Sequence, residues 1–240
     1  MLARTLEPEF MDDRAEAVDY NDMDFREVNE GFVRDLIASA RLTALPDPES
    51  PLGRDILDLG TGTARIPIEL CKTESHVRVM AADAAVEMLE LARYNIEVHS
   101  MLDRIQLHHG DAKKLIFQKE YFDTVMSNSL IHHLPSHDGF FREVLRVLRP
   151  GGFLFVRDLY RPSSDAEVER LVKEHAGQEN ERSQQLFRQS LHAGLTVAEL
   201  SEIVAPFGIP SEAIAMSSDR HWTLSYRKPI PTSATAASII

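Results

Sequence analysis

The chain has 240 residues, a formal net charge of −12 and 43% hydrophobic residues. This length suits one α/β domain with additions, and the negative charge disfavours binding to RNA or DNA phosphates, so nucleic acid is not an expected partner. The single cysteine, Cys71, excludes an intrachain disulfide. No stretch approaches the ~20 apolar residues of a membrane span, and the first residues lack the apolar core of a signal peptide. These features predict a cytoplasmic protein without a membrane span.

Residues 1–50 are expected to form an N-terminal helical cap. Residues 1–22 are acidic and irregular, whereas residues 25–44 carry apolar side chains at helical spacing. A proline-rich break at 46–51 then marks the entrance to the main domain. Aromatic and methionine side chains of this region are candidates for a lid over a site, although packing of the helix against a core would explain them as well: Phe10, Met11, Tyr20, Met23 and Phe25.

From residue 54 onward, strand and helix patterns alternate. The predicted strands are 54–59, 77–82, 104–109, 121–127 and 152–158, and the predicted helices are 64–73, 85–98 and 138–148. Strands that alternate with helices of about a dozen residues indicate a parallel sheet with helices on both faces. The main domain is therefore expected to span residues 51–228.

After residue 158 the alternation stops. Helices are predicted at 164–176 and 181–193, within a helical insertion at 162–194, and a further helix at 196–206 begins with Thr196 and Glu199 in a capping-box arrangement. Segments 212–217 and 221–227 are predicted to close the chain as a β-hairpin. The tail at 229–240 has no pattern and is expected to be disordered.

A glycine-rich turn follows the first predicted strand. The strand contains Asp58, and the turn contains Gly60, Thr61 and Gly62 before a helical pattern begins. Glycine permits backbone conformations and close ligand approach that a side chain would block, and the start of the helix directs unpaired amides toward a ligand. The turn is typical of a nucleotide-like ligand site.

Polar residues follow the other predicted strands as well. Asp83 lies 21 residues after Gly62, where α/β nucleotide sites place an acid that binds ribose hydroxyls. Asp111 follows the third strand and can accept a hydrogen bond from an adenine amino group, and Asn128 follows the fourth strand. Because ligands bind at the carboxyl ends of parallel strands, one site is expected there. Helix capping or a turn would be a simpler explanation for Asp83 and Asp111.

With these motifs in order, the chain resembles the class I S-adenosylmethionine-dependent methyltransferases. The segments that carry the resemblance are LDLGTGTARIPIEL, AADAAVEMLELAR, GDAKKL, FDTVMSNSLIHHL and EVLRVLRPGGFLFVRD, over residues 53–158 and, with the hairpin, to about 227. The resemblance implies a Rossmann-like seven-stranded sheet, mostly parallel with a C-terminal antiparallel hairpin and with helices on both faces. SNSLIHH and VLRPGG are most similar to the small-molecule and quinone-type members.

The resemblance also implies S-adenosyl-L-methionine as cofactor and S-adenosyl-L-homocysteine as product. Asp83 and Ala84 would bind the ribose, and Asp111 and Ala112 would flank the adenine. The residues implied near the methionine end and the reactive methyl group are Asp58, Gly60, Thr61, Gly62, Asn128 and Ser129.

One departure from the family pattern concerns the glycine turn. Ala64 stands where the family has a third glycine, which a small residue should tolerate. A dinucleotide fingerprint would need glycine or alanine at the next position, which is Arg65. This disfavours a nicotinamide-dependent oxidoreductase.

No residue is assigned as catalytic, because a sulfonium methyl group is already electrophilic. His132 and His133 are candidate proton acceptors since histidine titrates near neutrality. No metal is expected: Asp123 and Asp158 with a histidine could supply metal ligands, but no tight ligand cluster is evident in the sequence. Residues expected to contact the methyl acceptor are Tyr20, His132, Tyr160 and Arg161.

The sequence therefore predicts an enzyme that moves a methyl group to a small molecule by in-line displacement. The alternatives are a non-catalytic S-adenosylmethionine-binding or sensor protein and a methyltransferase that acts on RNA or protein. The identity of the acceptor and the atom that is methylated stay open, and a homodimer is possible.

Overall fold

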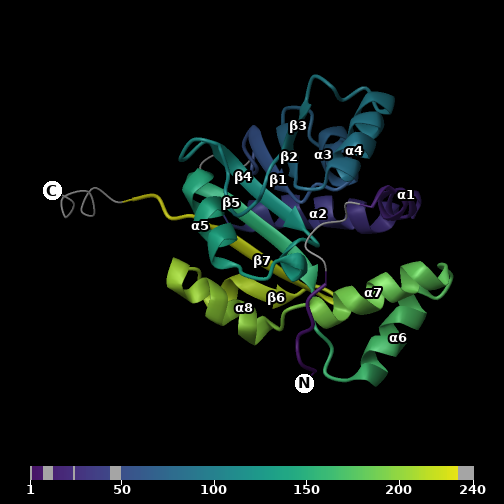
Figure 1. The fold of residues 1–240 in the computed structure, drawn as a ribbon. Coiled ribbons are helices and arrows are strands. Elements are labelled where there is room, and N and C mark those ends of the chain that lie inside the picture. The colour runs from purple at the N-terminus through teal and green to yellow at the C-terminus, as the bar shows by residue number, and fades with distance from the viewer. Residues whose placement is uncertain (1, 8–12, 24, 44–49, 232–240) are drawn as a thin grey trace.

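A computed structural model describes residues 2–7, 13–23, 25–43 and 50–231 of the chain. Seven strands form one sheet in the order β3-β2-β1-β4-β5-β7-β6 (Figure 1). The strands are β1 (Asp55–Leu59), β2 (Arg78–Asp83), β3 (Ile105–His109), β4 (Phe122–Asn128), β5 (Leu148–Leu159), β6 (Ile214–Met216) and β7 (His221–Arg227). The first five pair in parallel, and β7 pairs antiparallel with β5 and β6. The predicted fold class is thereby confirmed.

Helices cover both faces of the sheet because strand side chains alternate between two apolar clusters. Ile56 and Phe155 pack into one cluster with α2 (Arg26–Leu42), α3 (Arg65–Thr73) and α4 (Val86–Val98). Leu57 and Val156 pack into the other with α5 (Asp138–Val147) and α8 (Val197–Val204). A strand buried on both faces needs apolar residues at successive positions, as β5 has at Phe153–Val156.

The N-terminal region differs from its prediction. Residues 14–22, expected to be irregular, form α1 (Arg14–Asp22), which packs on α4. Ala17 and Tyr20 supply this contact with Ala85 and Met88. Tertiary packing thus stabilises a helix whose polar sequence shows no apolar periodicity. The expected lid residues Phe10 and Met11 and most of the expected disordered tail lie outside the described residues.

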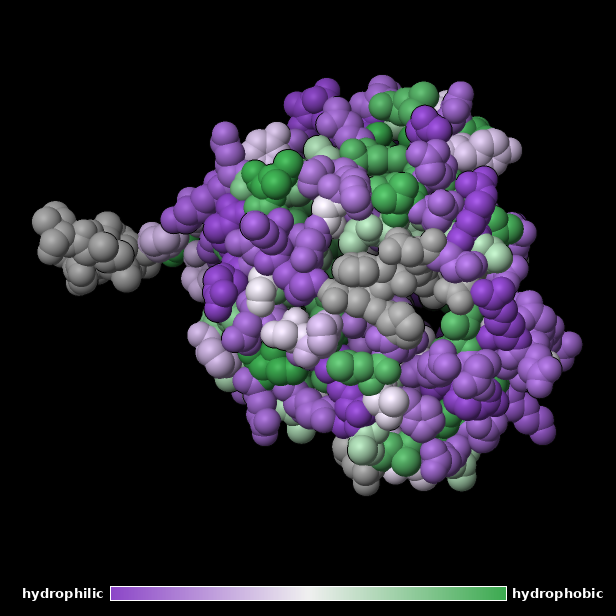
Figure 2. All heavy atoms as spheres, in the orientation of Figure 1, coloured by the Kyte–Doolittle hydropathy of each residue, from purple (hydrophilic) through white to green (hydrophobic). Residues whose placement is uncertain are grey.

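Residues after β5 form the predicted helices and hairpin. α6 (Asp165–Ala176) and α7 (Glu181–Ala193) lie side by side, and Figure 1 shows the arrowheads of β4 and β5 pointing into the region between α1 and α7. The capping box at Thr196 and Glu199 is present at the start of α8. In the same orientation, hydrophilic residues dominate the visible surface and hydrophobic ones form small separate patches outside the grey atoms (Figure 2).

Position 53, just before β1, requires glycine because the Asp123 side chain lies too close for a Cβ. The φ of Gly53 is +69°, and a Cβ added there would lie 2.3 Å from the Cβ of Asp123. The Asp123 carboxylate accepts hydrogen bonds from the backbone N–H groups of Arg54 and Asp55, at 2.9 and 3.0 Å. The Asp123 side chain therefore cannot move away from an added Cβ without breaking these hydrogen bonds.

We therefore expect Gly53→Ala to destabilise the protein more than Gly208→Ala. Gly208 has a similar φ of +73° but no atom within 4 Å of an added Cβ, so its substitution costs only backbone strain of about 1–2 kcal/mol. The Gly53 variant should lose about 1–3 kcal/mol more because of the overlap. Equilibrium urea unfolding of both variants measures the difference, and equal losses would contradict the steric explanation.

Candidate functional site

The carboxyl ends of β1, β2 and β4 meet at one edge of the sheet. Leu59, the last residue of β1, is in register with Ala82 of β2 and with Ser127 of β4. Because the strands are parallel, the residues that follow them lie side by side. The structure thus brings the glycine turn, Asp83 and Asn128 to one place, as the sequence predicted.

The glycine turn is fixed by backbone hydrogen bonds and by positive φ angles. The N–H groups of Gly60 and Thr61 both donate to the carbonyl of Ala82, at 2.9 and 3.0 Å. Gly60 and Gly62 have φ angles of +71° and +55°, and Ala64 has a φ of +60°. The third position of the turn is thus left-handed even though it holds alanine, which costs about 1–2 kcal/mol relative to glycine.

Asp83 ties the glycine turn to the start of α4. One of its carboxylate oxygens accepts from the Gly62 N–H at 2.7 Å and the other from the Ala85 N–H at 2.9 Å. Both the capping explanation and the site explanation therefore apply to this residue. Each oxygen can accept a further hydrogen bond, and Asp83 lines a cavity.

Two adjoining cavities flank the glycine turn, and together their walls contain all the residues predicted to bind the cofactor. One has a volume of about 350 Å³ and includes Gly60, Gly62, Asp83, Ala84, Asp111, Ala112, Asn128 and Ser129. The other, of about 690 Å³, includes Asp58 and Thr61, and it shares Gly60, Gly62 and Asn128 with the first. The Asn128 amide donates to the Ser129 hydroxyl at 3.2 Å.

Acidic groups dominate the electrostatics around the glycine turn. Asp58 is 2% exposed, and burial, together with the charge of Asp83, raises its pKa to about 7. Tyr20 lines both cavities, and burial and the charges of Asp83 and Asp58 raise the pKa of its hydroxyl. The cationic groups that line the two cavities include Lys113, whose ammonium lies 3.0 Å from Asp111, and Arg65, whose guanidinium donates to the Asn21 side chain. This part of the site suits a cationic ligand better than a pyrophosphate.

The first cavity continues away from the glycine turn. Its walls there come from α2, the loop after β4, α7 and the start of β7, and they include Val28, Leu134, Leu186, Phe187, Arg220 and His221. Burial and the charge of Arg220 lower the pKa of His221 to about 3, so its ring is neutral. This compartment is apolar with a few polar groups, as in small-molecule sites.

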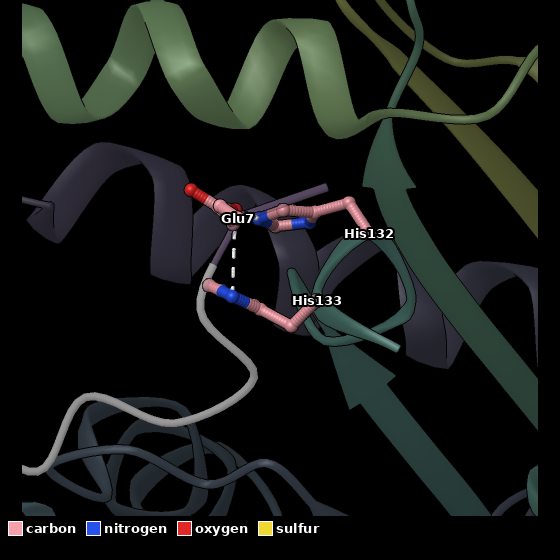
Figure 3. A group of neighbouring side chains, drawn as sticks. All are labelled: Glu7, His132 and His133. Atoms are coloured by element: carbon pink, nitrogen blue, oxygen red, sulfur yellow. Dashed lines mark ion pairs between the residues drawn. The ribbon is translucent and has the colours of Figure 1, made fainter. Parts of the chain in front are cut away.

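His132 lies between two carboxylates at the edge of this compartment. Its Nδ1 is 2.5 Å from Oδ1 of Asp158, and its Nε2 is 3.1 Å from Oε1 of Glu7. The same Glu7 oxygen is 3.4 Å from Nδ1 of His133, and both rings point toward it (Figure 3). Burial by itself lowers the pKa of His132, but the charges of Asp158 and Glu7 outweigh burial and raise it to about 10.

Comparison with known proteins agrees with this geometry. Residues 57–156 match the family described as a methyltransferase domain. Over this segment the chain is similar to methyltransferases. The resemblance to the class I S-adenosylmethionine-dependent methyltransferases is thereby confirmed, and this family implies S-adenosylmethionine as the methyl donor.

Relatives of known name share this domain. The chain is 31% identical to methyltransferase GfsG of Streptomyces halstedii over 107 residues, which are 45% of this chain and 38% of that protein. It is 33% identical to demethylmenaquinone methyltransferase of Staphylococcus saprophyticus over 114 residues, 47% of each chain. The chain thus matches less than half the length of these relatives.

A solved structure shares the fold over almost the whole chain. A putative S-adenosyl-L-methionine-dependent methyltransferase from Methanococcus maripaludis aligns with a TM-score of 0.65 and 19% identity, covering 95% of this chain and 99% of that one. At this identity the likeness shows the fold alone. None of the helices in the described parts of the chain is long and apolar enough to cross a membrane.

The structure does not support every acceptor contact predicted for the methyltransferase domain. Arg161 is 3% exposed and lines neither cavity. Its guanidinium donates to the carbonyls of Leu2 and Gly194 and pairs with Glu199, so it holds chain segments together. Tyr160 also lines neither cavity and packs against the core. Tyr160 and Arg161 thus lie outside the walls of these two cavities, and their contact with the methyl acceptor stays a prediction.

The predicted role of His132 as a proton acceptor is also unsupported. A ring with a pKa of about 10 already carries its proton at neutral pH, so it cannot accept another. His133 lines the first cavity and is 16% exposed in its side chain, and its role stays a prediction. Tyr20 lies by the glycine turn, 3.8 Å from where a Cβ of Gly62 would be.

Asp123 and Asp158, the candidate metal ligands of the sequence, lie apart in the structure. Asp123 lies at the amino end of β4 and accepts from Arg54 and Asp55, whereas Asp158 lies near the carboxyl end of β5. Two other groups in the described residues bring metal-ligating atoms together: Glu7, His132 and His133, and Glu174, His175 and Asp219. Sequence reasoning missed the first group because Glu7 carries no motif and is 125 residues from His132.

The raised pKa of Asp58 predicts a pH dependence of stability. The group titrates near 3.8 when unperturbed and near 7 in the folded protein. Between these pH values only the folded state holds the proton, so the free energy of unfolding falls as pH rises from about 4 to about 7 and is then flat.

Asp58→Asn should abolish this dependence. The variant should be more stable than wild type at about pH 8, by up to ~4 kcal/mol, and equally stable near pH 4. Urea unfolding across this range measures the difference, with the exposed Asp103→Asn as a matched control. A difference between wild type and the Asp58 variant that is constant with pH would show that the Asp58 carboxyl does not titrate there.

Proposed function

We propose that this protein is an S-adenosylmethionine-dependent methyltransferase that acts on a small molecule by in-line displacement. The observation that carries the proposal is the convergence of the glycine turn, Asp83, Asp111 and Asn128 on one cavity whose other walls carry apolar side chains of α7 and of the loop after β4. One end fits a nucleoside-like donor and the other has room for an acceptor. The matched methyltransferase domain supports this reading.

The residues present fit the donor. The carboxylate of Asp83 would accept hydrogen bonds from the two ribose hydroxyls beside Ala84, and Asp111 and Ala112 would flank the adenine. Asp58, with the turn Gly60–Gly62, would face the methionine end. Positive charge on this ligand, at its ammonium and sulfonium groups, would favour the ionised form of Asp58 and offset the cost of burying it.

The remaining groups hold the donor and the acceptor in line. S-Adenosylmethionine supplies a methyl group that is already electrophilic, so positioning is the main contribution of the protein and can supply up to ~7–11 kcal/mol in well-oriented systems. Asn128 and Ser129 line the first cavity and would lie near the reactive methyl group. Tyr20 and Phe25, whose rings are 5.1 Å apart, would cover the donor and exclude water.

The part of the first cavity away from the glycine turn, here called the acceptor compartment, favours a partly apolar molecule with a polar group. Leu186 and Phe187 offer apolar surface, and Arg220 and the neutral His221 offer hydrogen bonds. Two relatives, erythromycin 3''-O-methyltransferase and demethylmenaquinone methyltransferase, are named for small-molecule acceptors. The net charge of −12 argues against RNA as the acceptor. A cytoplasmic location and a homodimer stay predictions.

Asp83→Ala should weaken binding of S-adenosylhomocysteine. Loss of a buried acceptor costs about 1–3 kcal/mol, which corresponds to about 5- to 150-fold in dissociation constant. Isothermal titration calorimetry measures this, with the exposed Asp103→Ala as a control of equal charge change. Absence of binding to wild type would contradict the proposed function, and unchanged affinity in the Asp83 variant would remove Asp83 from the ribose site.

A turnover assay distinguishes an active methyltransferase from a non-catalytic binding or sensor protein. Wild type should form S-adenosylhomocysteine from S-adenosylmethionine only when a suitable acceptor is added. A panel of phenols, hydroxyquinones, amines and thiols, read by mass spectrometry, would identify the acceptor class. Tight binding of the donor without turnover on any acceptor would favour the non-catalytic reading.

A further inference from the structure

Glu7, His132 and His133 place three metal-ligating atoms at the spacing of a metal site. Oε1 of Glu7 lies 3.1 Å from Nε2 of His132 and 3.4 Å from Nδ1 of His133, and all three atoms lie within 4.8 Å of one another. Ligand atoms about 2.0–2.1 Å from a tetrahedral zinc ion are themselves about 3.3 Å apart. Both rings point toward the same carboxylate (Figure 3).

The surroundings orient these ligands. Asp158 contacts Nδ1 of His132 at 2.5 Å, which turns Nε2 toward Glu7. A metal-bound histidine almost always donates its other ring N–H to a carboxylate or carbonyl in this way. Oε2 of Glu7 accepts from the Ser190 hydroxyl at 3.2 Å. The other oxygen, Oε1, is buried and lies against the rings of both His132 and His133.

We propose that Glu7, His132 and His133 bind a zinc ion whose fourth position opens to the acceptor compartment. Two histidines, one glutamate and an open position are a ligand set of catalytic zinc sites. The side chains of His132, Glu7 and His133 are only 3%, 7% and 16% exposed, which leaves little room for the extra waters of a six-coordinate ion. The zinc ion takes the place of the proton that His132 otherwise holds toward Glu7.

The second group of ligating atoms is a poorer site. Glu174, His175 and Asp219 are exposed, and Nη1 of Arg220 lies 2.9 Å from both ring nitrogens of His175. A guanidinium so placed repels a second cation. This group therefore serves as an internal control.

The place of the zinc site suggests which acceptors it serves. Both histidines line the cavity that holds the acceptor compartment. A hydroxyl or thiol at the open position would lose its proton to solvent more readily. Its electron pair would then form the bond to the methyl carbon while the carbon–sulfur bond of the donor breaks. This consequence rests on the proposed function, whereas zinc binding itself does not.

Cobalt titration of the chelator-treated full chain tests the site. Wild type should bind one equivalent of Co²⁺ with the visible absorption of a four-coordinate ion, and Zn²⁺ should displace it. Glu7→Gln and His133→Asn should each abolish the signal, and Asp158→Asn should weaken binding about 10- to 100-fold. His175→Asn should bind as wild type does. Circular dichroism of each variant checks that it is folded.

Three results would overturn the site: wild type that binds neither ion, a signal that survives Glu7→Gln, or a signal lost in His175→Asn. Calorimetry with S-adenosylhomocysteine on the same samples separates the two proposals. Protein that binds this ligand but no metal contradicts the zinc site alone. Protein that binds metal but not this ligand contradicts the proposed function and leaves the zinc site in place.

Discussion

The parallel pairing of β1 with both β2 and β4 is the constraint on which the rest of the site depends. It aligns Leu59 with Ala82 and with Ser127, so that three loops from distant parts of the sequence begin at the same edge. The shared acceptor carbonyl of Ala82, which takes the N–H groups of Gly60 and Thr61, then fixes the turn against β2. A ligand that filled the cavities at this edge would contact all three loops.

A buried group of charged side chains lies after β4 and β5, at the same edge of the sheet. Asp158 is fully buried, and such a carboxylate is tolerated only when it is paired and hydrogen-bonded. It contacts His132 and accepts from the backbone N–H groups of Ile131 and Leu159. Glu7 extends this network to the N-terminal segment. The network orders the loop after β4, and it also supplies the ligand atoms of the proposed zinc site.

The two ends of the site differ in chemistry, and this difference is what favours methyl transfer. Buried acids such as Asp58 are costly beside the glycine turn unless a cation neutralises them. The compartment between α7 and β7 instead carries apolar side chains with the neutral His221 and the guanidinium of Arg220. A cationic donor and a partly apolar acceptor suit the two ends in this order, and the buried acids disfavour a pyrophosphate.

The sequence by itself determined the sheet, the glycine turn and the place of Asp83, because apolar periodicity and local turn chemistry act over a few residues and repeat along the chain. It failed where long-range contacts decide the outcome. α1 is stabilised by the packing of Ala17 and Tyr20 on α4. The Arg161 guanidinium donates to the carbonyls of Leu2 and Gly194, which are far from it in the sequence. His132 meets Glu7 only in the folded chain. Such contacts leave no periodic signal, since their free energy comes from packing and charge pairing that only the tertiary structure provides.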